Sequence, residues 1–304
     1  MPIVLPLGHP RSALGVAPSS VACEPRLRIG IINIMPKLEA YEENLLAPLA
    51  EHDTLVEPVL IRLHTHGYGS SDHRHLDSFY REFDEVLAEA PLDGLILTGA
   101  PVEELPFEEV HYFRELEKIL GYARTHIAMT LGLCWGGMVI GKLAGIEKCT
   151  LPRKLFGVFD DRVMVEQHDL FEGRSFPCAH SRHSGAIEDD VDAAARDGRI
   201  RLLSRGEQSG TSMFETPDGR FVAHLGHPEY NGERIAYEWE RDRNLGRRDV
   251  HPPENFDPAW PVTTWRNHRR ALFGGMIRRA WLVRDAVPVE TRRADDASAP
   301  QYCP

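Results

Sequence analysis

The fold of this chain is decided by the stretch Ile127-Ala-Met-Thr-Leu-Gly-Leu-Cys134-Trp-Gly-Gly-Met-Val-Ile140. An apolar run short enough for one buried strand leads to Cys134, and the apolar pattern after it is helical. Gly132 and Gly136 stand on either side of the cysteine, where glycines let a strand and a helix pass close to each other. This arrangement is typical of a nucleophile elbow, a strained turn between strand and helix that presents a reactive side chain.

A cysteine in such a turn is placed for nucleophilic chemistry. The positive end of the helix dipole favours thiolate over thiol, and a thiolate can attack a carbonyl carbon. The alternative is that Cys134 is an ordinary buried cysteine, which packs as a small apolar side chain. The G-x-C-x-G pattern alone does not decide between the two, because a motif needs its structural context.

The composition describes an ordinary globular protein that acts on small molecules. Its 304 residues allow one large or two small domains, with 42% hydrophobic and 27% charged residues. The formal net charge of -11 argues against nucleic acid and anionic membranes as partners, because both attract basic patches. A small-molecule substrate is therefore expected.

The cysteines and the N-terminal residues indicate a cytoplasmic location. Five cysteines are scattered at positions 23, 134, 149, 178 and 303, an odd number without the density of a disulfide framework. The first residues lack the basic and long apolar regions of a signal peptide. The longest uncharged run, residues 127–141, is too short to span a membrane. We therefore expect a reducing cytoplasm and no membrane partner.

The first half of the chain alternates between strand and helix patterns. Strands are predicted at 28–35, 55–63, 93–98 and 127–133, and helices at 38–51, 76–90 and 110–123. This alternation predicts an α/β fold with a mostly parallel sheet flanked by helices on both faces. Ligands of such sheets bind at the carboxyl ends of the strands, where Gly99-Ala100 and Cys134 would lie.

The second half of the chain has a different texture. Short apolar segments at 155–159, 163–165, 200–203 and 221–225 predict additional antiparallel strands, and helices are predicted at 231–245 and 264–282. We expect an extended N-terminal arm over residues 1–26, where prolines are closely spaced, and a single α/β domain over 27–284. Residues 285–304 have too little apolar content to order themselves and are predicted to be a disordered tail.

A thiolate needs a base, and the base needs a group that orients it. The segment Gly226-His227-Pro228-Glu229-Tyr230 follows a predicted strand, so His227 and Glu229 can face the same site. The alternative is that Gly-His-Pro only ends the strand. His64, His66, His73 and His75 have metal-like spacing but lack a convincing further ligand. They are expected in an exposed loop, and no metal is predicted.

With these residues in view, the chain resembles the homoserine O-acyltransferases, both O-acetyl and O-succinyl, which use a class I glutamine-amidotransferase-like (flavodoxin-like) fold. The resemblance runs from about residue 28 to residue 282. It is carried by Asn33-Ile-Met-Pro-Lys37, His75-Leu-Asp-Ser-Phe-Tyr80, Asp93-Gly-Leu-Ile-Leu-Thr-Gly-Ala-Pro-Val-Glu103, Thr130-Leu-Gly-Leu-Cys-Trp-Gly136, Lys154-Leu-Phe-Gly-Val-Phe159, His180-Ser-Arg182, Gly226-His-Pro-Glu-Tyr230, Arg241-Asp242 and Trp265-Arg-Asn-His268.

The resemblance implies a ping-pong acyl transfer without a bound cofactor. An acyl-CoA co-substrate would acylate Cys134, and His227, oriented by Glu229, would activate the acceptor hydroxyl. The main-chain N–H of Trp135 would hold the oxyanion, and Lys37 is a further candidate for the oxyanion or for CoA.

The resemblance also implies a binding site for the amino-acid acceptor. The residues that would bind this substrate are Lys154, Ser181 and Arg241. A guanidinium suits an α-carboxylate because it can bind both oxygens, so Arg241 is the natural clamp. From the residues alone, an ion pair of Arg241 with Asp242 or Glu238 is the simpler interpretation.

Glu103 bears on the choice of acyl group. In the family that the chain resembles, this position tends to be glycine in succinyl users and glutamate in acetyl users. A carboxylate in the acyl pocket would repel the succinyl carboxylate, at a cost of about 2 to 4 kcal/mol in a poorly solvated site. Acetyl-CoA is therefore the expected donor, with succinyl-CoA as the alternative.

The chain departs from the family pattern near the elbow and on the acceptor side. Gly137-Met138 replaces a small residue and glutamine, and Asp160-Asp161 replaces an acidic residue and histidine. L-homoserine remains the expected acceptor. L-serine or another hydroxy amino acid stays open, because one methylene changes specificity by only about 1 to 3 kcal/mol.

Two other classes of function remain as alternatives. A glutamine amidotransferase would use the same Cys and His-x-Glu arrangement. The other alternative is a binding or regulatory protein with this fold that no longer catalyses a reaction. The resemblance further implies a homodimer. It leaves open whether the product enters methionine biosynthesis or another pathway.

Overall fold

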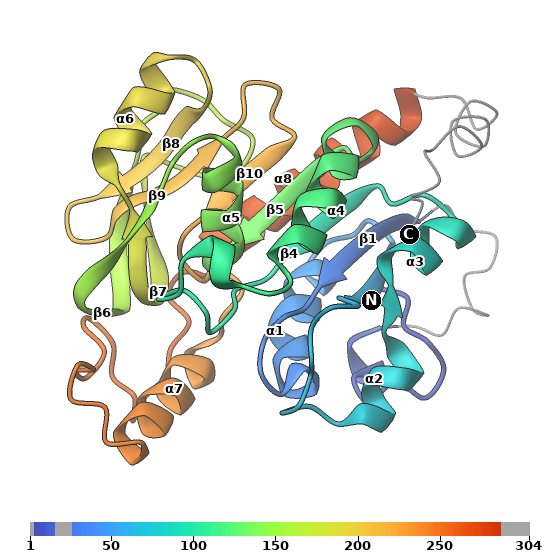
Figure 1. Ribbon diagram of the computed structural model, residues 1–304, viewed down its shortest axis with the longest axis horizontal. Helices are drawn as coiled ribbons and strands as arrows, with labels where there is room; N and C mark the ends of the chain where they lie inside the picture. Colours follow the sequence, from blue (N-terminus) through green and yellow to red (C-terminus); the bar gives the residue numbers. More distant parts are fainter. Residues whose placement is uncertain (1–2, 16–25, 287–304) are drawn as a thin grey trace.

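A single mixed sheet runs through the part of the chain that the computed structural model describes, residues 3–15 and 26–286 (Figure 1). Its ten strands follow the order β3-β2-β1-β4-β5-β10-β9-β8-β6-β7. The strands are β1 Leu27–Ile32, β2 Val56–Arg62, β3 Arg81–Glu82, β4 Gly94–Leu97, β5 Met129–Leu133, β6 Lys148–Val163, β7 Ser175–Ala186, β8 Arg201–Gly206, β9 Gly210–Glu215 and β10 Phe221–His224.

Helices connect and cover these strands. The α-helices are α1 Leu38–Ala50, α2 His73–Phe79, α3 Phe83–Glu89, α4 Phe113–His126, α5 Trp135–Leu143, α6 Glu188–Arg196, α7 Gly232–Asn244 and α8 Arg266–Ala286. Short 3-10 helices occur at Ser12–Leu14 and Phe107–Glu109. Within the described residues, none of the helices combines the length and the apolar character that crossing a membrane requires.

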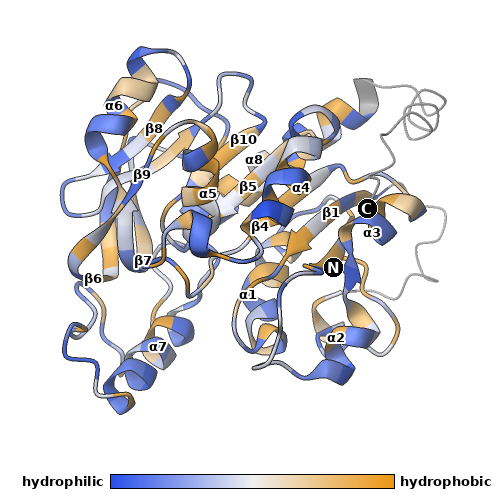
Figure 2. Ribbon diagram, in the orientation of Figure 1, coloured by the Kyte–Doolittle hydropathy of each residue, from blue (hydrophilic) through white to orange (hydrophobic). Residues whose placement is uncertain are grey.

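The strands from β3 to β10 in the sheet order are parallel to their neighbours. Their carboxyl ends therefore lie along one edge of the sheet. Every residue of β4, β5 and β10 is buried, as expected for strands covered on both faces. Figure 2 shows that these central strands are mostly hydrophobic, whereas α7 is mostly hydrophilic.

Two apolar layers pack on the two faces of the sheet. Because side chains alternate along a strand, Ile31 joins one layer and Ile32 the other. The first layer includes buried side chains of α1 and α8, and the second includes side chains of α3, α4 and α5. This is the predicted arrangement of a mostly parallel sheet between helices.

Two predictions about strands are wrong in detail. The segment 155–159 belongs to a long strand, β6, which ends at Val163, so Met164 and Val165 form no strand of their own; β6 pairs with β7 around a register shift between Thr150 and Leu155. The segment 221–225 was expected to be antiparallel, but β10 runs parallel to β5 and is antiparallel only to β9. An apolar pattern predicts that a strand exists but does not name its partner.

The predicted helix over 76–90 is two short helices, α2 and α3. Tyr80 has an extended backbone, with φ −104° and ψ 145°, which ends α2. Glu82 and Glu85 then form a capping box that starts α3. A continuous apolar face does not reveal such a break.

The N-terminal arm is partly inside the fold. Ile3 is fully buried and forms a parallel bridge with Val56 of β2. At the other end of the chain, α8 continues to Ala286, beyond the predicted end of the helix at 282. Residues 16–25 of the arm and 287–304 of the predicted tail lie outside the described residues. The division into arm, domain and tail stays a prediction.

The junction between β5 and α5 leaves no space for side chains at its glycines. A Cβ atom on Gly132 would overlap the carbonyl oxygen of Gly136, and a Cβ atom on Gly136 would overlap that of Leu97 at the end of β4. Both obstacles are backbone atoms, so they cannot move aside by changing a rotamer.

We expect Gly136→Ala to lower the free energy of unfolding by about 1 to 3 kcal/mol, because the new methyl group overpacks the junction. Urea unfolding of the purified variant measures this change. Gly121→Ala in α4 is the matched control, since its Cβ would meet no atom within 4 Å, and helix propensity predicts a gain of about 0.5 to 1 kcal/mol. Equal stabilities of the two variants would contradict the close packing.

Candidate active site

Cys134 occupies the turn between β5 and α5 with a positive φ. Its backbone has φ 50° and ψ −112°, a combination that is rare for residues other than glycine and is typical of strained functional sites. The Cys134 N–H donates to the carbonyl of His224 in β10 at 2.8 Å, and its carbonyl accepts from the N–H of Met138 at 3.1 Å. The cysteine is thus held at the N-terminus of α5, as the elbow pattern predicts.

His227 and Glu229 follow the adjacent strand β10. Nδ1 of His227 lies 2.7 Å from Oε1 of Glu229, and the His227 N–H donates to the carbonyl of Ala179 at 2.7 Å. The hydroxyl of Tyr41 in α1 donates to the same Glu229 oxygen. Glu229 is fully buried, so these two bonds fix the carboxylate behind the imidazole.

The structure brings Cys134 and His227 together at the carboxyl ends of β4, β5 and β10. A Cβ atom on Gly99 would lie 3.4 Å from Cβ of Cys134 and 3.6 Å from Cε1 of His227. The missing side chain at Gly99 therefore leaves room beside both groups. The thiol and the imidazole are near enough for the charge of Cys134 to act on His227.

The imidazole of His227 is favoured in its charged form. Burial opposes this charge, but the negative charges of Cys134 and Glu229 and their hydrogen bonds outweigh burial and raise the pKa of His227 well above its usual value. The arrangement can therefore hold a thiolate–imidazolium pair with a carboxylate behind it.

The two oxyanion or CoA candidates lie at helix N-termini on the same edge. The ring of Trp135 is fully buried against Tyr112 and Phe107, so only its main-chain N–H at the start of α5 can serve the site. Lys37 is exposed and has a positive φ of 51° just before α1, and its N–H donates to Oγ of Ser70 at 3.3 Å. Lys37 therefore lies at the rim, after β1.

The three predicted acceptor residues come from β6, β7 and α7 and meet around two carboxylates. Nζ of Lys154 lies 2.6 Å from Asp242, and Oγ of Ser181 donates to Glu238. Arg241 lies 2.7 Å from Asp242 and 3.8 Å from Glu238. The ion pairs of the simpler interpretation are thus present, but the Arg241 side chain is still 39% exposed, which leaves part of the guanidinium accessible.

Glu238 is a central residue of this group, although the sequence analysis named it only as a possible ion-pair partner of Arg241. It also accepts from the hydroxyl of Tyr230 at 2.9 Å and pairs with Arg234 at 3.1 Å. Burial tends to raise its pKa, but the charges of Lys154, Arg234 and Arg241 hold the pKa of Glu238 well below its usual range. The i, i+3 and i, i+4 spacing of acidic and basic residues in α7 was the available signal.

Glu103 lies in the loop after β4 and faces the same region. Its main-chain carbonyl accepts from Oγ of Ser184 at 2.8 Å and from Nζ of Lys148 at 2.5 Å. Burial raises the pKa of Glu103, although the charges of His227 and Lys154, among others, oppose this. Its Oε2 atom is buried without a hydrogen-bond partner among the described residues. A further negative charge placed beside this oxygen would therefore be unfavourable.

The predicted exposed histidine loop is wrong in one respect. His73 and His75 lie in α2, and His75 is buried with its Nε2 2.5 Å from Glu42. His9 of the N-terminal arm approaches the other oxygen of Glu42 at 3.4 Å, and this trio has the proximity of metal ligands. Arg11 donates its N–H to Nδ1 of His9 at 3.1 Å, so the neutral ring carries its proton on the Nε2 atom that faces Glu42. His75 is hydrogen-bonded to Glu42, whereas Nε2 of His9 and the second oxygen of Glu42 are buried without a hydrogen-bond partner among the described residues.

Solved structures with the same fold include a glutamine amidotransferase from Methylobacillus flagellatus, with a TM-score of 0.52 and 13% identity over 85% of this chain and 94% of that one. A glutamine amidotransferase from Thermotoga maritima has a TM-score of 0.50 and 16% identity over 86% and 98%. These likenesses confirm the predicted class I glutamine-amidotransferase-like fold.

Sequence comparisons identify the family. The model of the homoserine O-succinyltransferase family matches residues 21–287. A protein of Geobacillus kaustophilus named homoserine O-acetyltransferase is 36% identical over 255 residues, which cover 81% of this chain and 83% of that protein. One of the same name from Bacillus cereus is 35% identical over 259 residues, covering 83% and 84%. The chain therefore belongs to the homoserine O-succinyltransferase family and is an enzyme of the acyltransferase class.

Proposed function

We propose that this enzyme moves an acetyl group from acetyl-CoA to the side-chain hydroxyl of L-homoserine through a thioester on Cys134. The observation that carries the proposal is the strained Cys134 beside His227, with Glu229 hydrogen-bonded to the far nitrogen of the ring. Nucleophile, base and orienting group in this order are the requirements of covalent acyl transfer. The names of the relatives support homoserine as the acceptor and acetyl as the acyl group.

In the first half of the reaction, the thiolate of Cys134 attacks the thioester carbonyl of acetyl-CoA. The oxyanion of the tetrahedral intermediate is held by N–H groups at the N-terminus of α5, including that of Trp135, because these have no partner within the helix. The C–S bond to CoA then breaks, and His227 gives its proton to the departing CoA sulfur. The acetyl group remains on Cys134.

In the second half, the now neutral His227 takes the proton of the acceptor hydroxyl as that oxygen attacks the acetyl carbonyl. Collapse of the second tetrahedral intermediate releases O-acetylhomoserine and restores the Cys134 thiolate beside the imidazolium. Glu229, held in place by Tyr41, keeps Nδ1 protonated and Nε2 directed at the reacting groups.

The acceptor's charged groups match the cluster on β6, β7 and α7. The accessible part of the Arg241 guanidinium suits the α-carboxylate. The α-ammonium finds negative charge at Glu238 and Asp242, which hold Lys154 and Ser181 in place. These contacts would direct the side-chain hydroxyl toward Cys134.

Glu103 supports acetyl-CoA, rather than succinyl-CoA, as the acyl donor. Glu103 is half-buried, with one carboxylate oxygen buried and unpaired among the described residues, so a second carboxylate on the acyl chain would be repelled there. Acetyl-CoA brings no such charge. Succinyl-CoA, which the family's description suggests, is the competing donor.

The direct test is to incubate the protein with acetyl-CoA or succinyl-CoA and measure CoA release with L-homoserine, with L-serine and without an acceptor. We expect a stoichiometric burst with acetyl-CoA alone, the mass gain of one acetyl group on the peptide that contains Cys134, and turnover with L-homoserine. Cys134→Ala should abolish burst and turnover, and Cys149→Ser, at an exposed cysteine, should leave both intact. Ammonia released from glutamine, without any acyl adduct, would instead indicate a glutamine amidotransferase.

Replacement of Glu103 tests the choice of donor. Glu103→Gly should raise the ratio of kcat/KM for succinyl-CoA over acetyl-CoA by roughly 30- to 700-fold, which corresponds to removing about 2 to 4 kcal/mol of repulsion. Because the pKa of Glu103 is raised, it is protonated sooner as pH falls, so use of succinyl-CoA by the wild type should rise toward acidic pH. Glu104→Gly, at the exposed neighbouring glutamate, is the control. An unchanged donor ratio in Glu103→Gly would exclude this role.

Replacement of Arg241 tests the acceptor site separately from the donor site. Arg241→Met should raise KM for L-homoserine about 10- to 100-fold, as expected for the loss of charge-assisted hydrogen bonds, while the acetyl-CoA burst keeps its amplitude and rate. Arg243→Met, at an exposed arginine of the same helix, should change neither quantity. A loss of the burst in Arg241→Met would show that the residue serves something other than the acceptor. The expected homodimer stays a prediction.

A further inference from the structure

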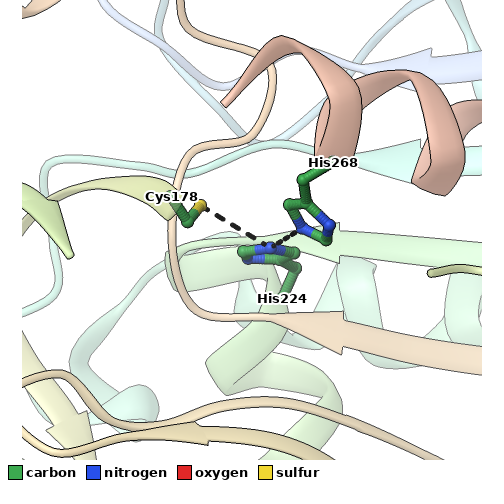
Figure 3. A group of neighbouring side chains, drawn as sticks. All are labelled: Cys178, His224 and His268. Atoms are coloured by element: carbon green, nitrogen blue, oxygen red, sulfur yellow. Dashed lines mark hydrogen bonds between the residues drawn. The ribbon is translucent and has the colours of Figure 1, made fainter. Parts of the chain in front are cut away.

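Three buried side chains meet behind the active site. Cys178 of β7, His224 of β10 and His268 of α8 point toward one another (Figure 3). Nε2 of His224 lies 2.9 Å from Nε2 of His268 and 3.8 Å from Sγ of Cys178. The ring of Phe176 stacks on His268 with 3.6 Å between the centroids. The cluster has no part in the chemical steps above.

His224 is bonded to both segments that carry the catalytic groups. Its carbonyl accepts the N–H of Cys134 at 2.8 Å. Its Nδ1 accepts the N–H of Gly226 at 3.0 Å, and Gly226 immediately precedes His227. One residue therefore connects the main chain of the nucleophile with the main chain beside the base.

These bonds fix the protonation of the two rings. Because Nδ1 of His224 accepts a hydrogen bond, the neutral ring carries its proton on Nε2 and donates it to Nε2 of His268. Burial keeps both rings neutral: it lowers the pKa of His224 well below the usual value and that of His268 to about 3. His268 is thus the acceptor that orients His224, and Phe176 holds His268.

The same three residues could be considered a zinc site, since a thiol and two imidazoles are the ligands that zinc prefers. The hydrogen bonds oppose this interpretation. The Nε2 atom of His224 that faces the cluster carries a proton and has no lone pair to offer. Sγ of Cys178 donates to the carbonyl of Ala179 at 3.5 Å, and burial raises the pKa of the Cys178 thiol well above its usual value. Each facing atom already has a hydrogen-bond role.

We propose that His224, oriented by His268, is a positioning residue that holds the turn at Gly226 and so keeps His227 against Cys134. The positioning of Cys134 and His227, called the dyad below, is independent of the proposed function. Only the reaction that the dyad performs rests on it.

The turn at Gly226 is tightly enclosed, so a lost bond there has to move it. A Cβ atom on Gly226 would lie 2.9 Å from the carbonyl oxygen of Ala179 and 3.0 Å from Sγ of Cys178. The Gly226 N–H is therefore shielded from water, and no solvent molecule replaces the imidazole when it is removed. A buried N–H without an acceptor is unfavourable, so the turn would shift to pair it with another acceptor. This shift would move the backbone of the adjacent His227.

The test compares His224→Asn with His224→Leu. The Oδ1 atom of asparagine can take the place of Nδ1 as acceptor for the Gly226 N–H, whereas leucine fills the space without an acceptor. If His224 only filled the core, leucine would be the better substitute, because an apolar side chain suits a buried site. If His224 positions the turn, asparagine rescues and leucine does not.

The readout is the rate at which iodoacetamide alkylates Cys134, followed by peptide mass. Alkylation requires the thiolate formed with His227 but no acyl-CoA, so it reports on the dyad even if the proposed acyl transfer is wrong. Exposed Cys149 is an internal control of reagent reactivity, and buried Cys178 reports unfolding. We expect alkylation of Cys134 to slow about tenfold or more in His224→Leu and less than about threefold in His224→Asn, with Cys178 protected in both.

His268 provides a second pair of variants that decides the matter if His224→Leu does not fold. His268→Gln keeps an acceptor for Nε2–H of His224 and should retain the alkylation rate, whereas His268→Leu should slow it. Equal rates within both pairs, with Cys178 protected, would overturn the proposal. So would about one tightly bound zinc ion per purified chain that His224→Asn removes, because Nε2 of His224 would then be a ligand rather than a donor.

Discussion

The active site depends on the parallel pairing of β5 with β10, and in particular on the hydrogen bond from the N–H of Cys134 to the carbonyl of His224. Parallel strands end on the same side of a sheet, so the turns that follow them open toward each other. Cys134 follows one strand directly, and His227 follows the other after two residues. Without this pairing, two segments more than ninety positions apart would have no reason to meet. The strained backbone at Cys134 is tolerated because the junction is enclosed by backbone on all sides, as the contacts of Gly132 and Gly136 show.

Much of the fold could be predicted because its central strands are apolar runs and its helices have apolar faces. The partner of β10 could not, since a short apolar strand looks the same beside any neighbour. The roles of Tyr41 and Glu238 in the site could not be predicted for a different reason. Each lies on a helix and contacts residues far away in the sequence, Tyr41 with Glu229 and Glu238 with Ser181 and Lys154. Helical spacing assigns Tyr41 to a buried face but does not indicate where its hydroxyl points. Cys134, His227 and Glu229 could be proposed from the sequence because each closely follows a predicted strand. Groups at the ends of parallel strands lie on the same edge of the sheet.

Buried charge is distributed unevenly across the site. Glu238 and Asp242 are surrounded by cations, which hold the pKa of Glu238 well below its usual range. Burial raises the pKa of Glu103, and one of its carboxylate oxygens has no partner among the described residues. The first environment suits a zwitterionic acceptor, because its charges can exchange with charges already present. The second is the environment on which the proposed preference for acetyl over succinyl rests.

The two histidines around the end of β10 show how neighbours, rather than burial, divide the roles. His224 and His227 are both almost completely buried, and burial disfavours the charged form of each. For His224 burial lowers the pKa, and the neighbouring histidines, His268 and His180 among them, add to this lowering instead of opposing it. His227 meets the negative charges of Cys134 and Glu229, and its pKa rises. The neutral ring keeps one accepting nitrogen and can hold a main-chain N–H, and the charged ring keeps a proton to give away. What distinguishes the proposed base, His227, from its proposed support, His224, is therefore the set of neighbours that the sheet places around each ring.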